Sequence, residues 1–205
     1  MEYTILSILW IAWCILHSAM ISLRFTSFLK KRLGRGYRYF RLFFNVTAAI
    51  TLIPPVWYCI HLRRHLLWQW TGFWTLPRWS LLALAAVLFI GGAMKYDLKQ
   101  FLGIRQILSG QTSNAITESG ELDTSGILSI TRHPWYLATL IFVWAQSSTV
   151  YISTLIVQII LSVYLVVGTV LEERKLIAEH GNVYRDYQKR VPMLFPLKWL
   201  SSRLF

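Results

Sequence analysis

An Arg-His-Pro triplet is the first feature of the sequence whose residue types could bind a charged ligand. In the segment GILSITRHPWY, residues 126–136, Arg132 and His133 stand directly before Pro134. An arginine can bind a carboxylate through two parallel hydrogen bonds, and a neighbouring histidine can donate or accept at the same end of the ligand. In isolation, the triplet also fits a basic flank of a membrane span in which the proline opens the next helix.

An acidic pair is the second such feature. Glu172 and Glu173 open the segment EERKLIAEHGNVYRDYQKRVPMLFP, residues 172–196, directly after an apolar run. A carboxylate without a partner is costly at a membrane boundary, so such residues pair with or bind a cationic group. If the helix continues past them, one glutamate faces the other helices and one faces water. Tyr184 and Tyr187 lie three residues apart and therefore share a helix face.

The apolar segment between the Arg-His-Pro triplet and the acidic pair determines whether the two lie close together in space. Residues 137–171 form an uncharged stretch of 35 residues, which as one helix would extend roughly 52 Å against about 30 Å of hydrocarbon. We therefore expect a helical hairpin that turns at the polar cluster of residues 146–149. Because a hairpin returns the chain to the side on which it started, both polar segments should lie together at one membrane face.

The composition places these features in a membrane protein. Of the 205 residues, 55% are hydrophobic and 15% are charged, whereas soluble domains carry about 25% charged residues. The sequence predicts an all-α, polytopic membrane protein with a single domain over residues 1–205, about five transmembrane helices and a cytoplasmic, helical carboxyl-terminal tail. The spans are expected near residues 3–23, 42–60, 79–94, 130–146 and 150–171. The last helix should continue to His180 and end at Gly181, because glycine commonly caps helices.

The distribution of basic residues predicts the orientation. With five spans and the amino terminus outside, all but Arg63, Arg64 and Arg78 of the 21 Lys and Arg residues lie on the cytoplasmic side, as the positive-inside rule requires. The carboxyl terminus is then cytoplasmic, and a bacterial inner membrane is the expected location. The net charge of +12 fits contact with anionic lipid headgroups, and no nucleic-acid partner is expected.

Other polar residues give weaker signals. Cys14 and Cys59 lie inside apolar runs, which supports neither a disulfide framework nor a zinc site, so no metal is expected. His17 lies within the first apolar run, where it needs an internal partner or serves as a ligand. The polar loop of residues 109–126 fits either a linker or a lid over a pocket.

The paired motifs carry a family resemblance. RHPWY, followed after a hairpin by EERKL, HGNVYRDY and VPMLFP, resembles the membrane methyltransferases that include isoprenylcysteine carboxyl methyltransferase and the bacterial phospholipid N-methyltransferases. Upstream, HSAMISLRFTSFLKK, GYRYFRLFFN and FLGIRQ are similar to the methanethiol S-methyltransferase subgroup. The chain departs from the family pattern at Phe44, where the family has tyrosine, and at Ala138, where it often has glycine.

The resemblance implies that the cofactor is S-adenosylmethionine, held between the two motifs. In this reading an arginine binds its carboxylate, a glutamate binds its ammonium or ribose, and tyrosines line the adenine or the sulfonium. The residues assigned to the cofactor are Arg132, His133, Tyr136, Glu172, Glu173, Tyr184 and Tyr187.

The resemblance also implies a small or lipophilic thiol-type acceptor. A thiol attacks well only as its thiolate, so a nearby cation such as Arg105 or Arg132 would favour the reaction. Arg105 and Gln106 are the residues assigned to catalysis, with Gln106 orienting the acceptor. Arg105 also fits a simple membrane-flanking cation.

Three alternatives stay open at this stage. His17-Ser18 and the Arg-His-Pro triplet also resemble zeta-carotene isomerase-like membrane proteins, which would imply a haem held by histidine. A methyltransferase that acts on a lipid amine or carboxylate fits the same motifs. A scaffold without enzymatic activity would keep the fold alone. The residues do not predict the oligomeric state.

Overall fold

The structure, a computed structural model, describes residues 1–109 and 122–195. Within these ranges the regular structure is helical, apart from the short paired strands β1 (Leu66–Gln69) and β2 (Thr149–Tyr151). The prediction of an all-α polytopic membrane protein is confirmed, although the strand pair was not expected. Most of the predicted polar loop and Pro196 lie outside the described residues. The described elements fall into two compact units.

Unit 1 contains the described residues of Met1–Leu67, Asp97–Ile116 and Tyr151–Ile160. Its elements are α1 (Glu2–Ile21), α2 (Leu23–Leu33), the 3-10 helix η1 (Gly34–Tyr39), α3 (Phe40–His61), α5 (Leu98–Leu102), α6 (Ile104–Ser109) and the first turns of α8 (Ile152–His180).

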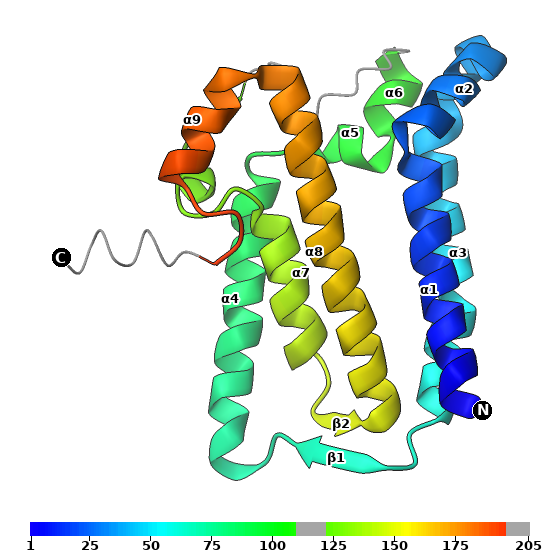
Figure 1. Cartoon of the computed structure of the whole chain (residues 1–205), viewed down its shortest axis with the longest axis vertical. Helices are drawn as coiled ribbons and strands as arrows, with labels where there is room; N and C mark the ends of the chain where they lie inside the picture. The colour runs from blue at the N-terminus through cyan, green and yellow to red at the C-terminus, as the bar shows by residue number, and fades with distance from the viewer. Residues whose placement is uncertain (110–121, 196–205) are drawn as a thin grey trace. The chain divides into compact units, whose positions relative to one another are not determined.

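Helices α1 and α3 lie side by side (Figure 1). The indole of Trp13 donates a hydrogen bond to the Ala48 carbonyl at 3.2 Å, which ties the two helices together. On α1, Leu6, Trp10 and Cys14 are buried. These residues recur every fourth position, as expected for one face of a packed helix.

Unit 2 contains the described residues of Trp68–Tyr96, Thr117–Val150 and Leu161–Phe205. Its elements are the 3-10 helix η2 (Gly72–Trp74), α4 (Thr75–Ala93), the 3-10 helix η3 (Gly126–Ser129), α7 (Pro134–Ala145), the remainder of α8, and α9 (Asn182–Arg190).

Helices α4 and α7 pack closely along their length (Figure 1). A Cβ atom at Gly92 would lie 2.5 Å from the Trp135 ring, so only glycine allows the indole to rest on α4. The same indole donates to the Phe89 carbonyl at 3.0 Å. At the other end of the pair, Arg78 donates to the Ala145 carbonyl at 2.9 Å. The two helices are therefore antiparallel neighbours.

Four helical stretches of the described chain are long and apolar enough to cross a membrane: Glu2–Ile21, Leu23–His61, Gly72–Ala93 and Ile152–His180. The remaining predicted span corresponds to α7, which has 12 residues and extends roughly 18 Å. This helix begins at Pro134 and not at residue 130, because Arg132 and His133 donate their backbone N–H groups to the carbonyls of Pro192 and Met193. That pairing with the tail keeps the preceding residues out of the helix.

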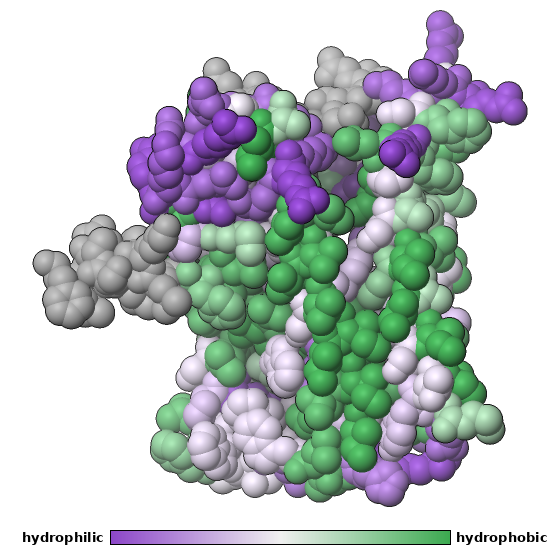
Figure 2. Space-filling view, viewed as in Figure 1, coloured by the Kyte–Doolittle hydropathy of each residue, from purple (hydrophilic) through white to green (hydrophobic). Residues whose placement is uncertain are grey.

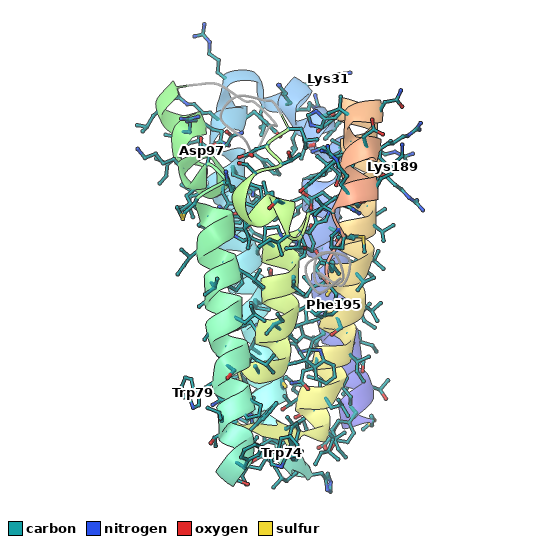
Figure 3. The ribbon with its side chains drawn as sticks, turned by 90° about the vertical axis from the view of Figure 1, so that its left-hand side faces the viewer. Lys31, Trp74, Trp79, Asp97, Lys189 and Phe195 are labelled. Atoms are coloured by element: carbon teal, nitrogen blue, oxygen red, sulfur yellow. The ribbon has the colours of Figure 1, made fainter. Side chains whose placement is uncertain are left out.

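Polar and apolar residues separate along α8 as an integral membrane protein requires. Hydrophobic residues cover the middle of α8, and hydrophilic residues cover α9 and the end of α8 (Figure 2). Within unit 2, Trp74 and Trp79 lie at the end opposite to Lys189 on α9 (Figure 3). Tryptophan is enriched where a membrane meets water. The apolar middle of unit 2 therefore lies between an aromatic end and a charged end.

The close approach at Gly92 gives a test of the α4–α7 packing. We expect Gly92→Ala to destabilise the protein by about 1–3 kcal/mol, because the added methyl group overpacks the Trp135 ring. The measurement is thermal unfolding in detergent, followed by circular dichroism. Gly36→Ala is the control, since its Cβ would meet only Leu33 at an ordinary 3.8 Å. Equal melting temperatures for both variants would contradict the packing described here.

Candidate functional site

The carboxylate of Glu173, on α8, is the centre of the buried polar cluster in unit 2. Its Oε1 accepts hydrogen bonds from Arg132 Nε at 2.9 Å and from the Tyr184 hydroxyl at 2.6 Å. Its Oε2 accepts from Arg132 Nη2 at 2.7 Å and from the Gln188 amide. Because the glutamate is only 8% exposed, this carboxylate needs its cationic partner and its hydrogen-bond donors to remain ionised.

Arg132 also holds the tail that follows α9. Its Nη1 donates to the backbone carbonyl of Gln188 at 3.2 Å and to that of Val191. The hydroxyl of Thr131 donates to the Met193 carbonyl at 3.1 Å. The guanidinium is thus shared between one carboxylate and two carbonyls, and the tail is fixed beside the Arg-His-Pro triplet.

His133 lies between the two glutamates. Its Nε2 is 2.7 Å from Glu173 Oε1, and because an ionised carboxylate only accepts, this nitrogen carries the proton. Its Nδ1 is 4.0 Å from Glu172 Oε2. The Glu172 side chain is 29% exposed, whereas that of Glu173 is 10% exposed. The prediction that one glutamate faces the other helices and one faces water is therefore confirmed.

Tyr136 shapes the region next to Glu172. Its ring packs edge-on against the His133 ring, with centroids 5.6 Å apart, and its hydroxyl lies near the Glu172 carboxylate. A Cβ atom at Gly168 would lie 3.4 Å from the Tyr136 ring. The result is a carboxylate with water on one side and aromatic carbon on the other.

The two tyrosines of α9 are structural members of the cluster. Both are at most 3% exposed, and their rings meet edge to face at 5.7 Å. The Tyr187 hydroxyl donates to the Leu128 carbonyl. Burial, together with the hydrogen bond to Glu173, raises the pKa of the Tyr184 phenol, and burial likewise raises the pKa of Tyr187. Both phenols therefore remain neutral donors over the physiological range.

A lysine anchors the segment that leads into the triplet. Lys95 Nζ donates to Asp123 Oδ2 at 3.0 Å and to Ser125 Oγ at 2.6 Å. Hydrogen bonds from the Ser125 backbone N–H and hydroxyl, with that of Lys95, lower the pKa of Asp123 to about 2. Gly126 adopts φ +61° beside the lysine stem, a conformation that favours glycine. The entry to η3 is therefore held by an ion pair.

Arg105 and Gln106 belong to unit 1 and have local partners there. Arg105 Nη1 lies 2.7 Å from Asp97 Oδ2, and the Asp97 side chain is 4% exposed. Gln106 Nε2 donates to the Gln100 carbonyl at 3.0 Å. Its Oε1 is buried and has no hydrogen-bond partner among the residues described.

Comparison with known proteins identifies the family of the chain. The family model described as NnrU protein matches residues 5–196. The chain belongs to the NnrU protein family. This NnrU-family chain is also 34% identical to methanethiol S-methyltransferase 2 of Bradyrhizobium diazoefficiens, over 67% of the chain and 56% of that protein. A methanethiol S-methyltransferase of Pseudomonas deceptionensis is 32% identical over 62% of the chain and 44% of that protein.

These matches confirm the resemblance to methanethiol S-methyltransferases that the motifs indicated. The NnrU-family chain spans about half the length of the curated relatives it matches. No solved structure matches the chain.

The structure brings together most of the residues that the sequence assigned to a cofactor, but in a different arrangement from the one expected. The Arg-His corner and Glu173 are in direct hydrogen-bonded contact, with no ligand-sized gap between them. Gln188 and Thr131 were missed. Gln188 lies four residues after Tyr184 on α9, and this helical spacing was the available signal. The specific ligand contacts of the assigned residues stay predictions.

Because Glu172 and Glu173 have different surroundings, replacing each of them should change the stability of this NnrU-family protein by a different amount. Glu173→Gln should cost about 3–5 kcal/mol, because it leaves the buried Arg132 guanidinium without its counter-charge. Glu172→Gln should cost less than about 1 kcal/mol, since this carboxylate keeps contact with water. Chemical unfolding of the detergent-solubilised variants measures both values. The cluster would lose its assigned role if the two variants proved equally stable.

Proposed function

We propose that this membrane protein transfers a methyl group from S-adenosylmethionine to a small or lipophilic thiol. The proposal rests on one structural observation: a water-accessible carboxylate, Glu172, stands beside aromatic rings on a rigid, fully hydrogen-bonded buried cluster. Such a carboxylate attracts a cation, and the named relatives are methanethiol S-methyltransferases. The similarity covers only part of those relatives, so the activity of this chain is a proposal.

The residues of unit 2 fit the charges of the cofactor. S-adenosylmethionine carries an ammonium and a sulfonium, which suit the Glu172 carboxylate and the electron-rich face of Tyr136. Tyr96 lies near the same carboxylate, and burial, together with the negative charge of Glu172, raises the pKa of the Tyr96 phenol. Tyr96 also packs edge-on against Trp135 at 4.7 Å. These groups together provide a negative and aromatic surface.

The seven assigned residues divide into two roles in this proposal. Tyr136 and Glu172 contact the ligand, because they lie on the side of the cluster that Glu172 opens to water. Arg132, His133, Glu173, Tyr184 and Tyr187 hold those two in place through the buried hydrogen bonds. For Arg132 to bind the cofactor carboxylate, as its place in the motif predicts, the guanidinium has to give up its hydrogen bond to Glu173 or to a carbonyl of the tail and form one to the ligand instead.

The chemistry requires little acid–base machinery from the protein. The cofactor, when bound, supplies an electrophilic methyl group on a good leaving group. The chain therefore has to align the reactants, exclude water and select the acceptor. His133 donates its Nε2 proton in a hydrogen bond to Glu173, so in this proposal the histidine supports the buried carboxylate.

The acceptor is proposed to be a thiol because the matched relatives are named for methanethiol. Arg105 and Gln106 are the residues proposed to act on the acceptor, Gln106 through its buried Oε1. A lipid amine or carboxylate is the competing acceptor class.

The protein is proposed to lie in a bacterial inner membrane with its amino terminus outside and its carboxyl terminus in the cytoplasm. This orientation places Arg35 inside and Arg63 outside. In a background with Cys14→Ser and Cys59→Ser, the Arg63→Cys variant should react with a membrane-impermeant maleimide on intact cells. The Arg35→Cys variant should react only after the cells are lysed, and the reverse pattern would overturn the orientation.

The activity is tested with purified protein, methyl-labelled S-adenosylmethionine and candidate acceptors that include methanethiol, with products identified by mass. We expect a labelled thioether. A label found only on an amine or a carboxylate would reject the thiol and retain the enzyme class. A Soret band in the absorbance spectrum, without methyl transfer, would favour the haem-binding alternative. A folded protein that neither binds the cofactor nor transfers methyl groups would favour a scaffold.

The proposed role of Glu172 is tested separately by isothermal titration with S-adenosylmethionine. Glu172→Gln should weaken binding about tenfold to a hundredfold, since a hydrogen bond to a charged group contributes about 1.5–3 kcal/mol. Glu179→Gln is the control, because Glu179 is an exposed carboxylate on the same helix that pairs only with Lys175 among the residues described. Unchanged affinity in Glu172→Gln would remove this residue from the cofactor site.

A further inference from the structure

The segment that joins α1 to α3 within unit 1 lies at a surface of the membrane. Helices α1 and α3 pack side by side (Figure 1), and α3, with 22 residues, extends about 33 Å, enough to cross the hydrocarbon. The connecting helix α2 has four basic residues among its 11, which makes it too polar for the hydrocarbon core. Residues 23–39, here called the basic linker, therefore lie where the membrane meets water.

The basic linker is packed against the start of α3. Leu29 and Tyr37 contact the buried cluster of Met20, Phe40 and Phe44. The Tyr37 and Phe40 rings also stack, with centroids 5.3 Å apart. These contacts fix the place of the linker beside the ends of both spans.

The described part of unit 1 has two carboxylates, and both are paired away from the basic linker. Glu2 pairs with Arg64 at 3.2 Å, and Asp97 pairs with Arg105 at 2.7 Å. No described residue forms an ion pair with any of the cations of the linker and the first turn of α3. These cations are Arg24, Lys30, Lys31, Arg32, Arg35, Arg38 and Arg41. The group therefore attracts an anion from outside the chain.

Arg41, in the first turn of α3, is half-buried, whereas the other six cations are exposed. Its Cζ lies 5.4 Å from the centre of the Phe44 ring and 5.0 Å from that of the Phe101 ring. Its Nε donates to the Phe101 carbonyl at 2.9 Å, but within residues 1–109 and 122–195 its Nη1 and Nη2 atoms donate no hydrogen bond. A cation partly removed from water favours an anion, and the free donors of a guanidinium suit a phosphate.

The guanidinium is held in place by the end of α5. Asn45, one turn after Arg41 on α3, donates to the carbonyls of Phe101 and Leu102 at 3.3 Å. A Cβ atom at Gly103 would lie 2.9 Å from a backbone nitrogen of α3, so α5 ends against α3 with no room to shift. The free Nη donors are therefore positioned before any ligand binds, which reduces the entropic cost of binding.

An apolar stripe continues from Arg41 along α3 into the membrane. Its exposed residues follow one another at intervals of three or four and so share a helix face; they are Leu42, Val46, Ile50 and Ile53. A soluble phosphate would contact the cation alone. A phospholipid contacts both, with its phosphate at Arg41 and its acyl chains along the stripe.

The basic linker itself has the character of a helix that lies in the membrane interface. Leu23 and Phe28 of α2 are exposed among the cations, and Figure 2 shows hydrophilic residues gathered at the end of unit 1 that carries α2. A helix with exposed apolar and basic residues binds the interface through both. Clusters of four to eight Lys and Arg residues next to a span are typical of sites for anionic lipids.

We propose that Arg41 and the basic linker bind the headgroup of an anionic phospholipid. The lipid phosphate accepts hydrogen bonds from the Nη atoms of Arg41, and the exposed cations of the linker surround the rest of the headgroup. The lipid supplies the negative charge that this end of unit 1 lacks. It is a bound ligand and not the methyl acceptor, so the inference is independent of the proposed methyl transfer.

The test is a lipid titration of the purified, detergent-solubilised protein, followed by native mass spectrometry. Phosphatidylglycerol and phosphatidylcholine with identical acyl chains are compared, because both carry a phosphate but only the first has a net negative charge. We expect the wild-type protein to bind phosphatidylglycerol at least about tenfold more tightly. Arg41→Gln should weaken the binding of phosphatidylglycerol about tenfold to a hundredfold, since it removes a charged hydrogen-bond donor.

Two further variants separate the site from a general effect of charge. Arg63→Gln is the matched control, because it removes one exposed cation just beyond the other end of α3 and should leave the affinity unchanged. The combined variant Lys30→Gln, Lys31→Gln and Arg32→Gln should abolish the preference for phosphatidylglycerol, since each cation near an anionic headgroup contributes roughly fivefold. All three residues are exposed, so this variant tests the site even if Arg41→Gln fails to fold.

Each other result contradicts a defined part of the proposal. Equal affinity of the wild type for the two lipids would overturn the lipid site. An affinity of Arg41→Gln equal to that of Arg63→Gln would remove Arg41 from it. Displacement of phosphatidylglycerol by an equal concentration of inorganic phosphate would show that the site binds a free anion. Because the titration contains no methyl donor, a protein that fails to methylate thiols would reject the proposed function and leave this inference standing.

Discussion

The rest of unit 2 depends on the hydrogen bonds to the buried Glu173 carboxylate. Their donors are Arg132, His133, Tyr184 and Gln188. A buried charge is tolerated only when its partners are complete, so these donors have to come together for the chain to fold here. Two of them, Tyr184 and Gln188, come from α9, and Arg132 and His133 come from the segment before α7, about 40 residues away from Glu173 in the sequence. One carboxylate thereby fixes the tail, the start of α7 and the orientation of the histidine.

The same constraint gives the two adjacent glutamates different surroundings. Once Glu173 accepts hydrogen bonds from Arg132 and from His133 Nε2, the adjacent Glu172 lies beside Tyr136 and stays partly exposed to water. Two identical residue types in adjacent positions thus acquire different properties. Their difference arises from burial, because desolvation makes the inner carboxylate dependent on protein partners, whereas the outer one keeps contact with water.

Unit 1 follows a parallel rule with the charges reversed. Asp97 is buried and takes Arg105, in the way that Glu173 takes Arg132. Arg41 is placed between Phe44 and Phe101 and has no such carboxylate among the described residues. In both units a buried carboxylate is neutralised by an arginine. Counting arginines in motifs does not identify these pairs, because a motif does not show which charges are already neutralised.

The sequence by itself determined the helical membrane class, the turn after residue 145, the end of α8 at His180 before Gly181, and the opposite environments of the two glutamates. These follow from chain length, hydropathy and helical periodicity, which act between residues close in sequence. Only the tertiary structure decided that Glu173 is the inner carboxylate, that it closes on Arg132, that α7 starts at Pro134, and that Arg41 and Asn45 hold the end of α5. Each of these depends on contacts between residues about 40 to 60 positions apart, and the burial of a charge at such a contact has no signature in a local pattern.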